Sequence, residues 1–307
     1  MNAVLGVDVG KTGCRAALRV AGGPALVREV SGAPGLAARE GVAATVDAVL
    51  GACRAALHDA GVTEIRAVGV GAAGAVAAPD AARALAVRLL AELPAAEVAV
   101  GSDAVTSHAG ALDGAAGVVL AVGTGAVAVG IGDDGTFALV DGWGPGLGDE
   151  GGGAWIGLAG LRAALQAHDG RGPATDLLPA AVDAFGDLVS LPAVLDAGGS
   201  PARVAASFAP AVARLAAGGD TAAVVIMNGA AAALARSVWA AARRIGGAEE
   251  VALTGGLLKL GPPLLGPLTA ALAGLRLVEP AGGSLDGAHL LALRRDTPHE
   301  TMLARVR

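Results

Sequence analysis

Two aspartates each follow a short apolar run, at the point where a strand of a sheet would end. Asp8 lies near the end of AVLGVDVG (3–10), and Asp103 ends AEVAVGSD (96–103). A carboxylate there can accept the proton of a hydroxyl that attacks a phosphoryl group, and it can hold Mg²⁺ through water. Asp103 is therefore a candidate general base and Asp8 a candidate metal-binding residue. The alternative for Asp103 is an ordinary helix N-cap.

Two similar glycine turns could bind phosphate groups. The first, GKTG, follows Asp8, and the second, GTG, follows the apolar run GVVLAV. Backbone N–H groups in such a turn can surround an anion. Because the motif occurs once in each half of the chain, we expect both turns to bind one polyphosphate. The candidate residues are Gly10, Lys11, Thr12, Gly123, Thr124 and Gly125.

Three further glycine motifs are less specific. The letters GKT suggest a P-loop, but only three residues separate Gly6 from Gly10 where a P-loop has four, and a strand follows instead of a helix. GVGAAG (69–74) fits GxGxxG, yet a dinucleotide-binding fold needs this motif in its first strand–helix unit. In LTGG, Gly255 and Gly256 would let a ring or a ribose approach the backbone, unless they form a routine turn.

The elements that position these motifs repeat in the order βββαβαβ. Such a duplication predicts an α/β protein with two similar domains, residues 1–113 and 114–307, and a cleft between them. The second copy carries three or four additional helices before residue 245. The predicted strands are 3–10, 14–20, 25–30, a strand within IRAVGVGAAG, 96–103, 117–123, 126–132, 136–142, 249–256 and 275–280, and the predicted helices include 38–60, 79–92, 154–169 and 284–295.

Composition excludes several classes of protein. The net charge of −6 argues against bulk binding of nucleic acid, which usually needs a basic face. The chain is 54% hydrophobic, but its apolar tracts are interrupted by glycine, threonine or asparagine before they reach the ~20 residues that a bilayer requires. The N-terminus has no basic segment ahead of Asp8 and Lys11, so no secretory signal is predicted. We expect a cytoplasmic protein that binds no membrane.

Cysteine and histidine give no catalytic or metal-binding pattern. Cys14 and Cys53 fall in a predicted strand and a predicted helix, where a free cysteine behaves as a small hydrophobic residue. His108 is expected on a helix surface, and no partner is evident for His289 or His299.

Together these motifs resemble the actin/sugar-kinase/Hsp70 superfamily of ATP-binding proteins. The stretch GWGPGLGDEGGGAWIG (142–157) is similar to the GWG-x-x-x-GDEGS-x-x-WI signature of N-acetylglucosamine kinases and the BadF-type ATPase family. The resemblance extends over essentially the whole chain. It implies two actin-like (ribonuclease H-like) βββαβαβ domains with an interdomain cleft.

The resemblance also implies an activity and a set of roles. The activity is ATP-dependent phosphorylation of an amino-sugar hydroxyl with Mg²⁺, with N-acetylglucosamine giving its 6-phosphate, and relatives suggest a homodimer. From its place in this stretch, Trp155 is expected in the core, while Glu150 is either a helix-start acid or a ligand. The implied roles are general base for Asp103, phosphate and Mg²⁺ handling for Asp8, Thr12 and Thr124, adenosine contact for Gly255 and Gly256, and sugar binding for Gly142, Trp143, Gly144 and Asp149.

The chain departs from the family on the acceptor side. Where an Asn that contacts sugar hydroxyls is expected, the loop SGAPGLAARE has Gly35 or Leu36. After GTG, Ala126 and Val127 replace the usual Ser-Asn. These changes leave the phosphate loops intact, and they leave the identity of the sugar open.

Two other activities fit the same resemblance. One is a BadF-type ATPase that activates a partner redox enzyme, but such proteins hold an iron–sulfur cluster through cysteines in glycine-rich loops, and Cys14 and Cys53 are not so placed. The other is a non-catalytic sugar sensor, although no helix-turn-helix segment is attached. An oxidoreductase built on GVGAAG is a further alternative.

Overall fold

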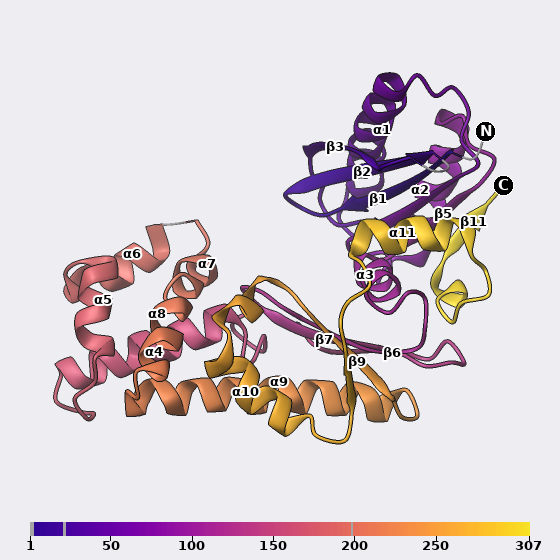
Figure 1. The fold of residues 1–307 in the computed structure, drawn as a ribbon. Helices are drawn as coiled ribbons and strands as arrows, with labels where there is room; N and C mark the ends of the chain where they lie inside the picture. Colours follow the sequence, from indigo (N-terminus) through magenta and orange to yellow (C-terminus); the bar gives the residue numbers. More distant parts are fainter. Residues whose placement is uncertain (1–2, 21–22, 198) are drawn as a thin grey trace. The chain divides into compact units, whose positions relative to one another are not determined.

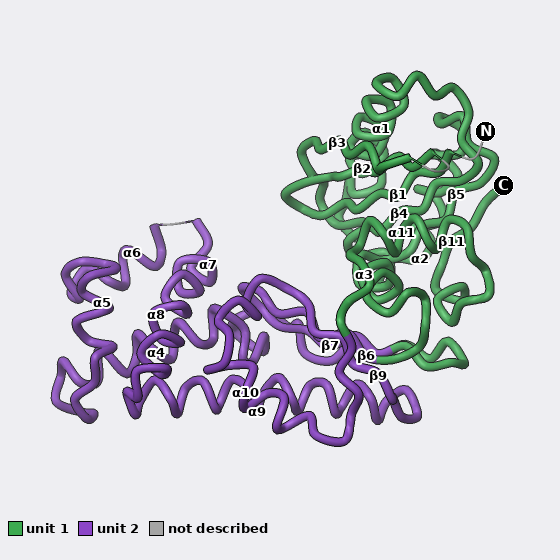
Figure 2. Tube along the Cα trace, in the orientation of Figure 1, with its two compact units in different colours: residues 1–117, 131–137, 279–307 green, residues 118–130, 138–278 purple. Residues whose placement is uncertain are grey.

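The chain divides into two compact units, each with its own sheet. The computed structural model describes residues 3–20, 23–197 and 199–307, and Figure 1 shows its elements. Unit 1 comprises Met1–Gly117, Ile131–Phe137 and Glu279–Arg307, and unit 2 comprises Val118–Gly130 and Ala138–Val278 (Figure 2). The expected boundary after residue 113 lies close to the division at Gly117. In contrast to the expected domains, residues 279–307 pack with the first sheet.

The sheet of unit 1 has the strand order β11-β5-β4-β1-β2-β3. Its meander forms because the turn at Gly10–Gly13 reverses the chain, so that Val9 pairs with Cys14. The edge strand β11 pairs antiparallel with β5 and was not predicted from the sequence. The strands are β1 (Ala3–Val9), β2 (Gly13–Val20), β3 (Leu26–Ser31), β4 (Ala67–Ala72), β5 (Val98–Gly101) and β11 (Ala304–Val306).

Helices cover both faces of this sheet. Successive side chains of a strand point to opposite faces, and apolar residues of β1 lie on both. Leu5 and Val7 on β1 belong to the core beneath α1 and α2, whereas Val4 packs with Ala292 of α11. Asp8 shares the side of Val4, so β1 directs its carboxylate toward α11. The helices of unit 1 are α1 (Gly41–Ala60), α2 (Pro79–Glu92), α3 (Asp103–Ala111) and α11 (Ser284–Leu293), with a short 3-10 helix, η3 (Glu300–Met302).

Glycines on the strands let α3 and α11 lie close against the sheet. A Cβ at Gly69 would overlap the carbonyl oxygen of Ala288, and one at Gly71 would overlap the hydroxyl of Thr106. The first two glycines of GVGAAG therefore allow helices to pack closely on β4. This strand follows the meander β1–β3 and helix α1 in the sequence. The motif does not open the first strand–helix unit, as a dinucleotide-binding fold requires.

We expect Gly69→Ala to destabilise the protein by about 1–3 kcal/mol, because the added methyl must displace the backbone of α11. Urea unfolding would measure the change. The matched control is Gly51→Ala in the middle of α1, where a Cβ meets nothing within 4 Å and helix propensity favours alanine. Equal stability of the two variants would contradict the close packing of α11 on β4.

The sheet of unit 2 repeats the order of the first. Its order β10-β9-β6-β7-β8 matches β5-β4-β1-β2-β3 position by position, so the predicted duplication is confirmed. Residues 131–137, which connect β7 and β8, belong to unit 1, where Phe137 lies against Val105 and Leu291. The strands are β6 (Gly117–Val122), β7 (Ala126–Ile131), β8 (Phe137–Asp141), β9 (Glu250–Thr254) and β10 (Arg276–Val278).

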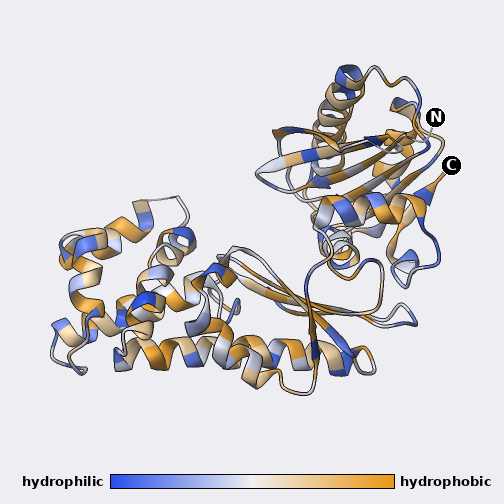
Figure 3. Cartoon of the chain, viewed as in Figure 1, coloured by the Kyte–Doolittle hydropathy of each residue, from blue (hydrophilic) through white to orange (hydrophobic). Residues whose placement is uncertain are grey.

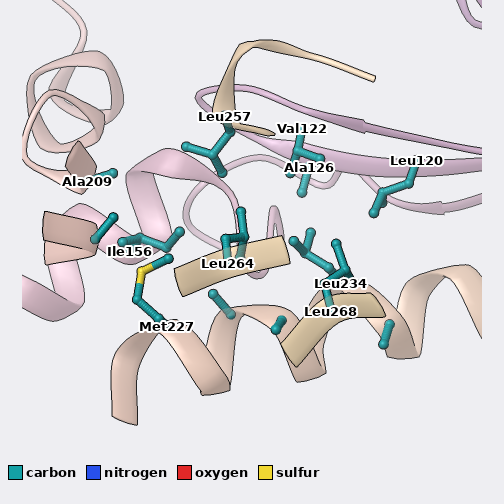
Figure 4. Packing of buried hydrophobic residues seen from close by; sticks show 14 of the residues in the cluster. Leu120, Val122, Ala126, Ile156, Ala209, Met227, Leu234, Leu257, Leu264 and Leu268 are labelled. Atoms are coloured by element: carbon teal, nitrogen blue, oxygen red, sulfur yellow. The ribbon is translucent and has the colours of Figure 1, made fainter. Parts of the chain in front are cut away.

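The core of unit 2 is built mainly from small and aliphatic side chains of the sheet and of α4, α9 and α10 (Figure 4). Among the described residues, five α-helices follow α4 before β9, where three or four were expected. The helices are α4 (Gly153–His168), α5 (Leu177–Phe185), α6 (Leu191–Ala197), α7 (Pro201–Ala206), α8 (Ala209–Ala217), α9 (Thr221–Arg244) and α10 (Pro262–Ala271), with the 3-10 helices η1 (Leu188–Ser190) and η2 (Gly256–Leu260).

Among the described helices, α9 alone is long and apolar enough by itself to cross a membrane, and half of its most apolar window is buried in the protein. It packs against α4, α8 and α10, and Met227, Leu234 and Val238 are buried in the core. Hydrophobic and hydrophilic residues alternate along it (Figure 3). Its apolar composition is accounted for by this packing.

Candidate functional site

In unit 1, a chain of hydroxyl groups anchors the carboxylate of Asp8. Ser284, the first residue of α11, donates from Oγ to Asp8 Oδ1 at 2.9 Å. The same Oγ lies 2.9 Å from Oγ1 of Thr106 on α3. Neither Ser284 nor Thr106 was identified from the sequence, and no local signal could find Ser284, which is 276 residues from Asp8.

The other oxygen of Asp8 forms an ion pair with Arg15. Arg15 Nη2 lies 2.6 Å from Asp8 Oδ2, and the Asp8 side chain is only 18% exposed. With both oxygens engaged by protein groups, this carboxylate fits an indirect Mg²⁺ contact through the water shell that the ion usually keeps. Within the described ranges, no cluster of three or more His, Cys, Asp or Glu residues is arranged for direct ligation.

Asp103 is the first residue of α3 and is not its N-cap. Ser102 takes that position, because its Oγ accepts from the backbone N–H of Val105 at 3.2 Å. Asp103 Oδ1 accepts from the N–H of Ala104 at 2.9 Å, and Oδ2 receives no hydrogen bond from another described residue. Burial raises the pKa of Asp103, and the negative charge of Asp8 raises it further. A carboxylate with a raised pKa and a free oxygen is a better proton acceptor than an ordinary aspartate.

The first predicted phosphate turn directly follows Asp8. Gly10 closes it by donating from its N–H to the carbonyl of Gly13 at 3.0 Å. Lys11 and Thr12 at its tip are exposed, and in the described part of the chain their N–H groups make no hydrogen bond. Unit 1 therefore brings together Asp8, Asp103 and a turn with available donors.

In unit 2, the second predicted turn is held by the start of α4. Gly153 and Ala154 donate from their N–H groups to the carbonyls of Gly123 and Thr124, both at 2.8 Å. These bonds satisfy donors that the first turn of a helix otherwise leaves free. The helix begins at Gly153, one residue before the predicted start at 154, and Gly152 is its N-cap. Trp155 itself is partly buried against the core, as predicted.

The predicted adenosine loop lies beside this turn. Thr254 at the end of β9 pairs with Ala121 of β6, so Gly255 follows at the same edge of the sheet as Gly123. Gly255 has a φ of +104°, and a Cβ there would overlap the carbonyl oxygen of Val122. Glycine is thus required both by the backbone conformation and by the close approach.

A pocket of about 460 Å³ opens between α8, α9 and α10. One of its lining residues, Pro262, follows the end of η2 by two positions in the sequence. Its walls are mostly apolar, and Asn228 contributes a side-chain amide. The lining residues are Ala216, Ala217, Val224, Met227, Asn228, Pro262, Pro263 and Pro267.

The glycine-rich stretch places Asp149 against the second phosphate turn. The carboxyl carbon of Asp149 lies 2.6 Å from the position that a Cβ would take on Gly125. For Glu150, the sequence left two roles possible, a helix-start acid or a ligand. Its side chain forms an ion pair with Arg236 of α9 at 2.9 Å. Unit 2 therefore brings Asp149 and Gly255 close to the turn Gly123–Gly125, which contains Thr124.

The remaining predicted sugar-binding residues lie in the loop between β8 and Asp149. Gly142 and Gly144 have φ angles of +74° and +85°. Trp143 is 75% exposed and packs over Gly148, and Leu147 beside it is 88% exposed. An exposed indole offers a flat apolar face to a ligand.

The expectation that His108 lies on a helix surface is wrong. His108 and His299 are both fully buried, and their Nδ1 and Nε2 atoms are 2.9 Å apart. His108 Nε2 donates to the carbonyl of Gly117 at 3.0 Å, so Nδ1 accepts from His299. Burial lowers the pKa of His108 to about 4 and that of His299 to about 3, so both rings are neutral at neutral pH.

Two sheets of the same strand order, with glycine turns after the equivalent strands β1 and β6, define an actin-like α/β protein. The chain belongs to the BadF/BadG/BcrA/BcrD ATPase family, whose model matches residues 5–264.

Three relatives illustrate the similarity. A candidate N-acetylglucosamine kinase from Chromobacterium violaceum is 30% identical, with a TM-score of 0.70 over 96% of this chain and 99% of that one. The N-acetylmuramic acid/N-acetylglucosamine kinase of Clostridium acetobutylicum is 37% identical over 81 residues, which are 26% of each protein. This chain therefore matches only about a quarter of that curated relative's length. A ROK family glucokinase from Streptomyces griseus, solved with glucose and AMPPNP, shares the fold with a TM-score of 0.54 and 22% identity over 95% of this chain and 99% of that one.

Proposed function

We propose that the protein is an ATP-dependent kinase that phosphorylates a hydroxyl of an amino sugar, with N-acetylglucosamine as the expected acceptor. The observation that carries the proposal is Asp103, a largely buried carboxylate with a raised pKa and a free oxygen close to Asp8. In the proposed reaction, Oδ2 of Asp103 takes the hydroxyl proton as the sugar oxygen attacks the γ-phosphorus in line. The bond from the γ-phosphorus to the β-phosphate oxygen breaks, and ADP leaves.

Each unit carries residues suited to binding a nucleotide. From unit 1, the turn Gly10–Thr12 offers free N–H donors, and Asp8 would accept hydrogen bonds from the waters of Mg²⁺, which neutralises phosphate charge when bound. From unit 2, Gly123–Gly125 would meet the phosphates and Gly255–Gly256 the ribose. The pocket beyond η2 suits the base, because it has apolar walls for the ring and the Asn228 amide for its polar edge.

The sugar would contact the loop that carries Trp143 and Asp149. Asp149 would accept hydrogen bonds from sugar hydroxyls, and the exposed Trp143 ring would cover an apolar face of the sugar. Gly35 and Leu36 offer no side-chain polar group, so the sugar would make fewer hydrogen bonds to the protein than the family pattern implies.

An ADP-release assay over a panel of amino sugars and neutral hexoses tests the proposal. We expect N-acetylglucosamine to give sugar-dependent ADP release and a phosphorylated sugar detectable by mass spectrometry. If no sugar on the panel stimulates ADP release, the proposal is wrong.

The burial of both cysteines supports a kinase over an iron–sulfur ATPase. Cys14 and Cys53 lie in the core of unit 1 with no exposed surface. Burial raises the pKa of Cys14 to about 12, and it also raises the pKa of Cys53. Cluster ligation needs accessible thiolates, and these two thiols are buried and protonated.

If Ser284 holds Asp8 for the magnesium-bound nucleotide, Ser284→Ala should lower kcat/KM for Mg·ATP by about tenfold, because a hydrogen bond to a charged group is lost. Steady-state kinetics with Mg·ATP varied would measure this. Ser190→Ala is the control, since Ser190 Oγ also makes one hydrogen bond, to the carbonyl of Asp187, on the surface. Indistinguishable kinetics of the two variants would exclude a positioning role for Ser284.

A further inference from the structure

The carboxylate of Asp141 ties together the two ends of the exposed loop Gly142–Gly148. Its Oδ1 accepts from the N–H of Asp149 at 2.7 Å, and its Oδ2 accepts from the N–H of Glu150 at 2.9 Å. One side chain at the end of β8 thus holds the backbone at the far end of the loop. A carboxylate that accepts two N–H bonds fixes both the distance and the orientation of the segment that donates them.

Both aspartates adopt a backbone conformation that side chains disfavour. The φ angle is +64° at Asp141 and +57° at Asp149, in the left-handed region. Among the described residues outside glycine, only these two and Asp113 have positive φ. Non-glycine residues in this region persist where the surroundings hold them, and such positions cluster at functional sites. Here the holding contacts are the two hydrogen bonds of Asp141.

The position of the Asp149 side chain follows from this backbone. Its carboxylate lies against Gly125, where a Cβ would leave it no room. A change in φ at Asp149 would therefore swing the carboxylate away from the second phosphate turn. Asp141 is close-packed as well, because a Cβ on Gly148 would overlap its Oδ1.

We propose that Asp141 is a positioning residue that fixes Asp149, and with it the Trp143 loop, in the arrangement that binds the acceptor sugar. This proposal rests on the proposed function for its kinetic consequence. Its structural part is that the Asp141 carboxylate holds the Asp149 and Glu150 amides, and this part is independent of the proposed function.

Hydrogen exchange tests the structural part without any substrate. Three variants separate the effects: Asp141→Asn keeps a side chain that tolerates the left-handed region, Asp141→Gly adopts it freely but loses both hydrogen bonds, and Asp141→Ala loses the bonds and adds strain. Peptides that contain the Asp149 and Glu150 amides should exchange at least about tenfold faster in Asp141→Gly and Asp141→Ala, with Asp141→Asn in between.

The control is Asp134→Asn. Asp134 Oδ1 likewise accepts from a backbone N–H, that of Thr136, at 2.8 Å, but in a hairpin that belongs to unit 1. This variant should leave exchange around Asp149 unchanged. Asp141→Gly with wild-type exchange at these amides would overturn the proposal.

Kinetics test the functional part. We expect Asp141→Gly to raise KM for the sugar about tenfold or more and KM for ATP less than about threefold, because a misplaced binding group costs affinity for the group it contacts. Asp141→Asn should recover part of the loss. Equal effects on both KM values, or on kcat alone, would overturn the positioning role. If the wild-type protein phosphorylates no sugar, the proposed function fails, while the exchange experiment still decides whether Asp141 holds Asp149.

Discussion

Asp103→Asn is expected to lower kcat for sugar phosphorylation by about 10²–10⁴-fold while the protein stays folded. The amide is isosteric with the carboxylate and can still accept from the N–H of Ala104, so the start of α3 is preserved. It cannot take the hydroxyl proton. Steady-state rates of ADP release at saturating sugar would measure the loss.

The control for this substitution is Asp80→Asn. Asp80 is also an acid in the first turn of a helix of unit 1, at the start of α2, and it should leave kcat unchanged. The pH dependence gives a second test. Because burial raises the pKa of Asp103, kcat/KM should begin to decrease on acidification at a pH above the ordinary aspartate pKa of about 4. Full activity of Asp103→Asn would exclude Asp103 as the base.

The second large effect is a loss of stability in mild acid. In the unfolded chain a histidine titrates near pH 6.5, but in the folded protein the pKa of His108 is about 4 and that of His299 about 3. Between these values the unfolded state binds more protons than the folded state, so the free energy of unfolding falls as the pH falls. For His108 alone the full shift corresponds to roughly 3 kcal/mol.

Urea unfolding at pH values from 6.5 down to 5 would measure this, because most carboxylates stay ionised in that window. The double variant His108→Gln/His299→Gln should show a shallower dependence on pH, whereas His58→Gln, which changes an exposed histidine, should keep the wild-type slope. A free energy of unfolding that is constant over the window would show that the pair does not stay neutral.

Much of the fold could be predicted from the sequence because its signals are local. Helix 79–92 was placed correctly because Pro79 marks its start and apolar residues recur at helical spacing. The strands of both meanders followed from short apolar runs between glycine turns, and their repetition gave the duplication. The convergence of Thr124 and Gly255 could be anticipated, since parallel strands end at the same edge.

The parts that were missed depend on contacts between distant segments. His108 looked like a surface residue because nothing near it indicates that His299, 191 positions later, would be its partner. Asp141 adjoins a glycine that needs positive φ, but its acceptor role depends on how the loop returns to Asp149. The short strand β11 has three residues, too few for an alternating pattern to be distinguished from a loop.

The last residues of the chain complete its first unit, which affects the order in which the protein can fold during synthesis. A ribosome releases the N-terminus first, and N-terminal domains commonly fold before the rest is made. Here α11 covers β1 and β4, and Ser284 restrains Asp8, so unit 1 must wait until all of unit 2 has been translated. At 5–20 residues per second this delay lasts on the order of ten seconds. During that time the face of β1 and β4 that carries Gly6 and Gly69 lacks the helix that covers it in the folded protein.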